Sequence, residues 1–148
     1  MTMNALFLLA RVAGQDVAIL SERVESVVDI GPVAPVPRTA PAVCGLAALR
    51  SRVVTVIDTA QAIDPASRSG GGRRAVVTQV DGHHYALLVD MLDDAYRCVA
   101  RPLSAGLTPG PAWAPVVDGV IDHDDRPVLV LNLAAVVART AGGEQAAA

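Results

Sequence analysis

Short valine-rich apolar segments alternate with polar turns along the whole chain. The turn signals recur at intervals of roughly 8 to 15 residues, a rhythm that is typical of all-β sandwiches and barrels. We therefore predict about nine strands, over residues 5–12, 17–20, 24–30, 52–58, 74–80, 85–90, 95–100, 116–121 and 127–133. The chain divides into two halves of similar style.

Glycine and proline mark the boundaries between these strands. The segments Ala13-Gly14-Gln15-Asp16 and Asp81-Gly82 predict hairpin turns. Four prolines between residues 32 and 41 predict an extended, irregular stretch, because proline fits neither a helix interior nor a central strand. Residues 65–72 end in three glycines and predict a flexible connector between the two halves.

Helices are few and short in this pattern. We expect a helical turn at 21–23, a brief helix at 59–63 capped by Asp58 or Thr59, and a last short helix at 134–140 before a frayed tail. Residues 42–49 have Val43 as their only β-branched residue, so they fit either a helical turn or a loop that leads into a strand.

Composition supports a folded β domain. Hydrophobic residues make up 52% of the 148 positions and aromatic residues only 3%, so alanine and valine must fill the core. A chain of this length is one compact domain, or two small intertwined ones, that needs neither disulfides nor a structural metal. The high apolar fraction excludes disorder.

Charge and cysteine content exclude several classes of function. All twelve basic residues are arginine and none of them cluster beyond a pair, so no nucleic-acid footprint is present. Cys44 and Cys98 are far apart in apolar contexts and predict buried thiols in a reducing compartment. The apolar N-terminus is too short for a signal peptide, and the longest apolar run, 128–138, is below the ~20 residues of a membrane span. We expect a cytoplasmic protein without direct membrane insertion.

One segment resembles catalytic equipment. Asp58-Thr59-Ala60 follows a strong strand, as the catalytic aspartate does in retropepsin-type proteases, where two copies bring two carboxylates together. The alternative is that Asp58 caps the helical turn that follows it. Both interpretations remain open on the sequence alone.

Metal and cofactor chemistry has little support. His83 and His84 are adjacent in a turn, where their side chains point apart, and His123 lies in an acidic turn; we expect solvated residues instead of ligands. The triple glycine lacks the lysine of a phosphate loop, and no nucleophile elbow is present. We expect no cofactor and no metal.

Arg50 stands out among the polar residues. It lies between an apolar segment and an apolar strand, where burying it alone would be costly. It is therefore either a solvent-facing residue or a contact presented to a partner.

The segments around Arg50 resemble the CheW-like domain family, the adaptor fold of bacterial chemosensory arrays. Its pattern is an apolar segment with a glutamate, a proline-rich stretch, a glycine five residues before an arginine, and a strand that ends in aspartate. Here these elements match Val24-Glu25-Ser26-Val27, residues 35–41, Gly45 with Arg50, and Val56-Ile57-Asp58. The match continues in order through Leu87-Leu88-Val89-Asp90, Val117-Asp118-Gly119-Val120 and residues 129–133, and it covers residues 6–138.

The resemblance implies two interlocked five-stranded barrels of the Src-homology-3 type with short helices, in a single domain over residues 1–148. It also implies a non-enzymatic adaptor. Such adaptors bind the cytoplasmic signalling tip of chemoreceptors in a groove between the barrels and dock the regulatory domain of a CheA-type histidine kinase at barrel ends. A small-ligand β-barrel is a third interpretation, which predicts a closed apolar cavity instead of an open groove.

The resemblance also assigns partner-binding residues. Arg50 matches the family arginine implicated in partner contact, with Gly45 at its fixed spacing. Val24, Glu25, Ser26 and Val27 match the groove wall, and Val89 and Asp90 match a strand facing it.

Three positions depart from the family pattern. Ser26 replaces its glutamate, Ser51 its glycine and Thr55 its proline. If that glycine requires a positive φ, Ser51 carries strain or the turn differs. These departures fit a divergent adaptor of a non-flagellar chemosensory pathway.

Overall fold

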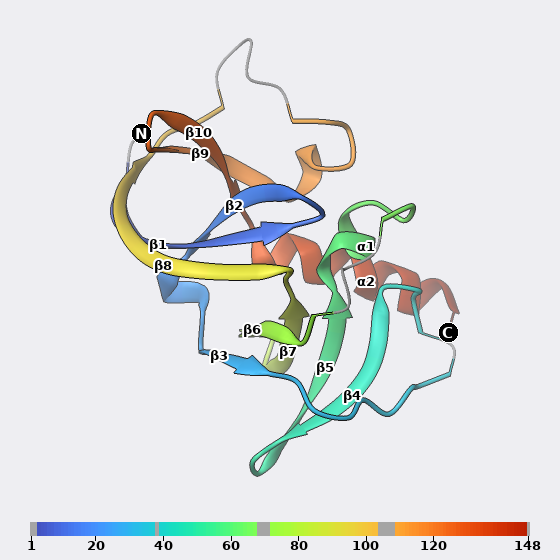
Figure 1. The fold of residues 1–148 in the computed structure, drawn as a ribbon. Coiled ribbons are helices and arrows are strands. Elements are labelled where there is room, and N and C mark those ends of the chain that lie inside the picture. Colours follow the sequence, from blue (N-terminus) through green and yellow to red (C-terminus); the bar gives the residue numbers. More distant parts are fainter. Residues whose placement is uncertain (1–2, 38, 68–71, 104–108, 148) are drawn as a thin grey trace.

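Ten strands pair into two sheets of five in the computed structural model, which describes residues 3–37, 39–67, 72–103 and 109–147 (Figure 1). The first sheet has the order β8-β1-β2-β10-β9, from β1 (Met3–Val12), β2 (Gln15–Leu20), β8 (Met91–Ala100), β9 (Val117–His123) and β10 (Arg126–Leu131). The second has the order β3-β6-β7-β5-β4, from β3 (Ser26–Asp29), β4 (Val43–Leu49), β5 (Arg52–Asp58), β6 (Arg74–Val80) and β7 (His83–Leu88). The predicted all-β architecture is confirmed.

The two sheets share one pairing pattern. In the first sheet β2 runs parallel to β10, and in the second β7 runs parallel to β5, while all other neighbours are antiparallel. Position by position, β8, β1, β2, β10 and β9 correspond to β3, β6, β7, β5 and β4. Each sheet is therefore built to the same plan.

An isolated bridge joins the two edges of each sheet. Arg101, just after β8, pairs with Val120 of β9, and Ala34, after β3, pairs with Leu46 of β4. Both bridges are made by two backbone hydrogen bonds of 2.8 to 2.9 Å. The sheets are thereby closed into barrels, which we call the first barrel and the second barrel.

A glycine lies at each closing bridge. A Cβ at Gly45 would lie 2.2 Å from the carbonyl oxygen of Ala34, and one at Gly119 would lie 2.5 Å from that of Arg101. Gly45 also has a φ of 143°, which L side chains rarely adopt. Both barrels therefore close through a backbone approach that only glycine permits.

The barrels interlock because the chain leaves the first barrel and returns to it. β1 and β2 belong to the first barrel, β3 to β7 to the second, and β8 to β10 to the first again. The connector expected near 65–72 joins α1 to β6; its residues 68–71 lie outside the described residues.

The predicted hairpin turns have the required backbone. Ala13 and Gly14 have φ values of 53° and 76°, and Asp81 and Gly82 have 52° and 80°. Two successive positive φ values are the signature of the type I′ turn, whose twist suits a β-hairpin. The turn at Asp81-Gly82 is so tight that β7 begins at His83, two residues earlier than predicted.

In the part of the chain that the structure describes, four helical segments cover the junction of the barrels: η1 (Ser21–Arg23), α1 (Thr59–Ile63), η2 (Ala114–Val116) and α2 (Leu133–Ala147). Figure 1 shows α1 and α2 close together beside the junction, where the Arg139 side chain of α2 donates a 2.8 Å hydrogen bond to the carbonyl of Ala62. The frayed tail expected over residues 142–148 is wrong as far as Ala147, because α2 continues to that residue. Its two glycines lie between Ala141 and Glu144, which both favour helices, and a glycine lowers helix stability by only about 1 kcal/mol.

Two strand boundaries are also settled. Residues 43–49 form a strand, so the helical alternative for 42–49 is wrong; pairing with β5 outweighs the weak strand preference of alanine. β8 begins at Met91, four residues before the predicted start. The prediction missed these residues because the exposed Asp93 and Asp94 make this part of the strand resemble a loop in sequence.

Small aliphatic side chains fill three core clusters. One fills the first barrel around Phe7 and Ile121, one fills the second around Val54 and Val56, and the largest lies between the barrels around Ile57. All five of these side chains are 0% exposed. The barrel interiors hold side chains, so the closed cavity of the small-ligand interpretation is absent from the described residues.

Among the described residues, none of the helices has the length and apolar character needed to cross a bilayer.

We expect Gly45→Ala and Gly119→Ala each to lower the free energy of unfolding by about 3 kcal/mol or more, because the new methyl group collides with a closing carbonyl. Chemical denaturation measures this loss. Gly31→Ala is the matched control: its Cβ would meet nothing within 4 Å, and stability should change by less than about 0.5 kcal/mol. Equal stability of all three variants would contradict the closure mechanism.

Candidate partner-binding site

A groove of about 490 Å³ lies between the two barrels. Its first wall comes from β1, β2, β8, β9 and β10 of the first barrel, and its second from η1 and β6. The residues that line it include Phe7, Leu20, Ala100, Val130, Arg23, Gln79, Val80, Arg101 and Asp118. The adaptor interpretation predicts an open groove between the barrels. The residues that the resemblance assigned to its walls do not line this one: Val24, Glu25, Ser26, Val27, Val89 and Asp90.

The groove combines an apolar floor with an ordered polar rim. Arg101 holds Asp122 through two side-chain hydrogen bonds of 3.0 and 3.2 Å from one nitrogen. The Asn132 amide donates a 3.0 Å hydrogen bond to Asp118. Arg23 and Gln79 are exposed at the opposite rim. Such a surface suits an apolar helix face flanked by polar residues.

A charged cluster lies at the mouth of the second barrel. Glu25 accepts a hydrogen bond from Arg52 through one carboxylate oxygen, and Nε2 of His84 lies 3.2 Å from the other oxygen. Along their strands Arg52 and His84 have the same parity as the inward-facing Val54 and Ala86, so they lie where the interior opens to solvent. Glu25 thus bridges the entry to β3 with β5 and β7.

Arg50 lies in the two-residue turn between β4 and β5, beside this mouth. It is exposed and has a φ of 54°, whereas Ser51 is absent from the positive-φ residues. The strain considered for Ser51 is therefore wrong: the turn differs, and Arg50 takes the left-handed conformation. This geometry costs a non-glycine residue about 1 kcal/mol or more.

The other residues expected on the groove wall follow Arg23 into β3. Val24 is half-buried against the core between the barrels, and the backbone N–H of Glu25 bonds to the carbonyl of Val77. Ser26 is exposed, and Val27 is 39% exposed. Glu25, Ser26 and Val27 are therefore accessible, whereas Gly45 is buried at the barrel closure.

Val89 and Asp90 lie at the other end of the β6-β7 hairpin. Val89 is 2% exposed and packs in the core between the barrels. Asp90 accepts a 2.9 Å hydrogen bond from the backbone N–H of Ala13, and its own N–H donates to the carbonyl of Arg11. The structure thus places both residues where the chain crosses from the second barrel to the first, and Val89 offers a partner no surface.

The sequence interpretation missed an exposed apolar face on the β4-β5 hairpin. Val53 is 61% exposed and Leu46 is 39% exposed, and they are diagonal neighbours on the outer face of the β4-β5 hairpin. Thr55, at the family proline position, pairs with Leu46 on this face. The two-residue alternation along β5 could have indicated the exposure of Val53, since Val54 and Val56 face inward.

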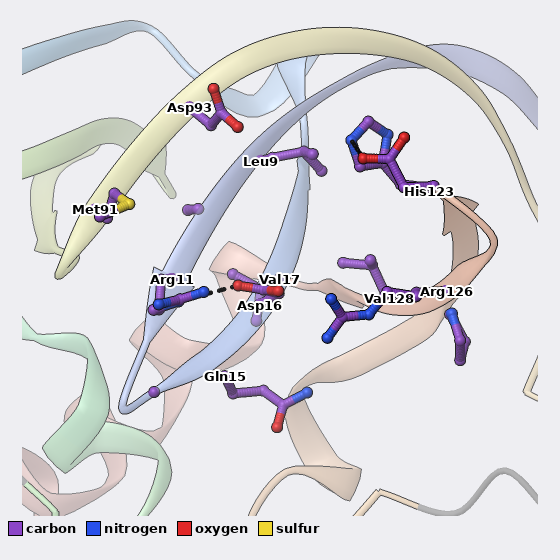
Figure 2. Close-up of a pocket in the computed structure, with 14 residues that line it drawn as sticks. Leu9, Arg11, Gln15, Asp16, Val17, Met91, Asp93, His123, Arg126 and Val128 are labelled. Atoms are coloured by element: carbon purple, nitrogen blue, oxygen red, sulfur yellow. Dashed lines mark hydrogen bonds and ion pairs between the residues drawn. The ribbon is translucent and has the colours of Figure 1, made fainter.

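A second pocket, of about 390 Å³, opens at one mouth of the first barrel (Figure 2). Leu9, Val17 and Val128 form its apolar part, and charged side chains at strand ends and in one turn form its edge. Figure 2 shows Arg11 paired with Asp16, whose side-chain atoms are 3.1 Å apart. The pocket is an open, mixed-charge barrel end.

Asp58 is a helix cap. Its carboxylate accepts a 3.2 Å hydrogen bond from the backbone N–H of Gln61, at the start of α1. Asn132, in the corresponding position after β10, accepts a 2.9 Å bond from the N–H of Ala135 at the start of α2. The two joints therefore use a carboxylate and an amide for the same task, which explains Asp58 without protease chemistry.

Asp58 also affects a neighbouring thiol. Burial, and to a smaller extent the negative charge of Asp58, raise the pKa of Cys44 above its ordinary value. Burial alone raises the pKa of Cys98. Both thiols are free, and no group of three potential metal ligands occurs in the part of the chain that the structure describes.

Comparison with known proteins places this geometry in a family. A family model of the CheW-like domain matches residues 6–141. The fold is similar to the crystal structure of the scaffolding protein TtCheW from Thermoanaerobacter tengcongensis, with a TM-score of 0.74 and 19% sequence identity over 90% of this chain and 88% of that chain. A search of curated proteins found no match.

We expect Asp58→Asn to keep the stability of the protein within about 0.5 kcal/mol, because asparagine and aspartate cap helices equally well, and Asp58→Ala to cost about 1 kcal/mol. Thermal or chemical unfolding measures both values. A large loss in the asparagine variant would show that the charge itself is structural.

The same Asp58→Asn variant should make Cys44 more reactive. Removing the negative charge lowers the pKa of this thiol, so more thiolate is present at a given pH and alkylation accelerates. Mass spectrometry of the alkylated protein across pH 7 to 10 separates the two cysteines. Cys98 is the internal control, because Asp58 does not affect its pKa. An unchanged rate at Cys44 would contradict the assigned cause.

Proposed function

This chain belongs to the CheW-like domain family, and on that premise we propose that it is a non-enzymatic adaptor that couples chemoreceptors to a CheA-type histidine kinase. The observation that carries the proposal is the open groove between two barrels in a chain that matches the family over nearly its whole length. We further propose that it acts in the cytoplasm, at receptor arrays under the inner membrane.

The groove would receive the cytoplasmic signalling tip of the receptor. A helix that lays its apolar face against Leu20, Val80 and Val130 would exchange water for hydrocarbon along the floor. Arg23 and the Arg101–Asp122 pair at the rim would fix its register, since rim charges determine orientation more than affinity.

The barrel ends would dock the regulatory domain of the kinase. The mouth of the first barrel is an open pocket edged by charged side chains and lined in part by the buried Leu9, Val17 and Val128 (Figure 2). The exposed Val53 and Leu46 provide a second apolar surface, next to Arg50 at the end of the second barrel. Both surfaces contain aliphatic and arginine side chains, as expected in a chain of which only 3% is aromatic.

Arg50 is the side chain that we propose contributes most to partner contact. It is exposed and lies in the two-residue turn between β4 and β5, with a left-handed backbone. Arginine is also enriched among the residues that dominate binding energy at interfaces. Glu25, Ser26 and Val27 would contribute along the neighbouring edge, while Gly45, Val89 and Val24 would support the surface from within.

Arg50→Ala should weaken binding to the receptor tip or the kinase regulatory domain by about 1 to 2 kcal/mol while the fold stays intact. Calorimetric titration against each purified partner measures the loss. Wild-type affinity for both partners would refute the assignment of Arg50.

Arg50→Gly provides the matched control. It removes the same side chain but relieves the left-handed strain, so the protein should become about 1 kcal/mol more stable than the alanine variant while binding equally weakly. If the more stable glycine variant bound its partners more tightly than the alanine variant, the binding loss would reflect stability, and a direct contact of the guanidinium would be contradicted.

Gln79→Trp should obstruct the inter-barrel groove and weaken receptor-tip binding at least tenfold, because the larger ring occupies the space of the helix. Gln15→Trp makes the same change at the mouth of the first barrel and should leave receptor-tip binding unchanged. Fluorescence anisotropy with a labelled receptor-tip fragment measures both. If both variants weakened receptor-tip binding equally, the inter-barrel groove would not be the receptor site.

A further inference from the structure

The two halves of this chain are structural repeats that exchange one strand. Residues 3–63 give five strands and α1, and residues 74–147 give five strands and α2 in the same order. In each half the third strand leaves its own barrel: β3 pairs with β6 of the second half, and β8 pairs with β1 of the first half. The exchange is reciprocal.

Neither half holds a complete barrel. Within the first half, β1 pairs with β2 and β4 with β5, but β3 has no strand partner there. The second half is arranged likewise. The pairings β1-β8, β2-β10, β3-β6 and β5-β7 all join one half to the other. Each barrel therefore consists of a hairpin from one half and three strands from the other.

The core follows the same division. The cluster inside the first barrel combines Phe7 of the first half with Ile121 of the second. The cluster inside the second barrel combines Val54 with Ala86, and the cluster between the barrels combines Ile57 with Leu87. Each cluster thus needs side chains from both halves, so one half alone would leave all of this surface exposed to water.

We propose that the two halves are complementary interaction surfaces, and that a second copy of this chain can supply either half in a strand-exchanged dimer. In that dimer the first half of one copy pairs with the second half of the other, twice, so two complete lobes form. Every pairing and core contact of the monomer recurs in each lobe; the connection from α1 to β6 then joins two lobes instead of lying within one. The inference does not depend on the proposed adaptor function.

The dimer would carry two inter-barrel grooves on one particle. Each groove needs residues from both halves, since Leu20 and Arg23 come from the first and Gln79 and Val80 from the second. Exchange would therefore place two complete grooves on one particle.

Complementation between two defective full-length chains tests the proposal. Gly45→Val obstructs closure of the second barrel and lies in the first half, and Gly119→Val obstructs closure of the first barrel and lies in the second half. When the two variants are refolded together with different affinity tags, exchange pairs the intact first half of one with the intact second half of the other. We expect a 1:1 dimer that carries both tags and about half of the native circular-dichroism signal, although neither variant gives a native signal alone.

A pair with both defects in the same half is the matched control. Gly45→Val with Val54→Asp offers no intact first half, so no native lobe should form. Ordinary dimerisation joins chains that are already folded, so it cannot restore the fold of two defective variants. Rescue by the opposite-half pair therefore distinguishes strand exchange from ordinary dimerisation. Rescue by the same-half pair, or no doubly tagged dimer from the opposite-half pair, would overturn the proposal.

Wild-type chains keep the test decisive if a single valine variant folds by itself. Differently tagged wild-type chains are refolded together at high concentration and then diluted. An exchanged dimer retains both tags after dilution, because separation requires unfolding, whereas only monomers would overturn the proposal.

Discussion

The close approach of two backbones at each barrel seam determines much of this structure. A five-stranded sheet of this size can bury its interior only if its edges meet, and here they meet at one antiparallel bridge per barrel. The carbonyl oxygens of Ala34 and Arg101 occupy the space in which a side chain at Gly45 or Gly119 would lie. Closure also positions the groove, because Arg101 and Gly119 of the first seam both line it.

Small side chains are the second consequence of this closure. Narrow barrels leave room for valine, isoleucine and alanine but for few aromatic rings, and Phe7 is the only phenylalanine of the chain. The aliphatic composition therefore reflects the geometry of the interior. It also limits recognition, since a surface poor in aromatic residues relies on aliphatic contacts and arginine for its binding energy.

Local structure was largely predictable from the sequence, because it depends on neighbouring residues. The helical turn at Ser21–Arg23, the strands Arg52–Asp58 and Arg74–Val80, and α1 at Thr59–Ile63 have the predicted bounds. The strand at Val43–Leu49 remained ambiguous, since its stability comes from the distant β5 and from the bridge to Ala34. The exchange of β3 and β8 between the halves is equally non-local and has no signal in hydrophobic periodicity.

The candidate site was less predictable than the fold for the same reason. Family resemblance indicated Glu25 and Arg50, but the contacts of Glu25 with Arg52 and His84 depend on how three strands converge at a barrel mouth. Val89 and Asp90 illustrate the opposite case: they match the family pattern, yet they lie at the crossing between barrels and stabilise it. Sequence similarity thus marks positions under constraint without separating surface contacts from structural ones.

The spacing of Gly45 and Arg50 follows from the geometry of one hairpin. Gly45 pairs with Val56 after a β-bulge, and Leu49 pairs with Arg52 at the turn, so the length of β4 between the seam and the turn is fixed. Inserting one residue would turn the inward-facing Ala47 toward solvent and move Arg50 to another face of the turn. The five-residue step therefore follows from closing the barrel at one end of β4 and making the turn to β5 at the other.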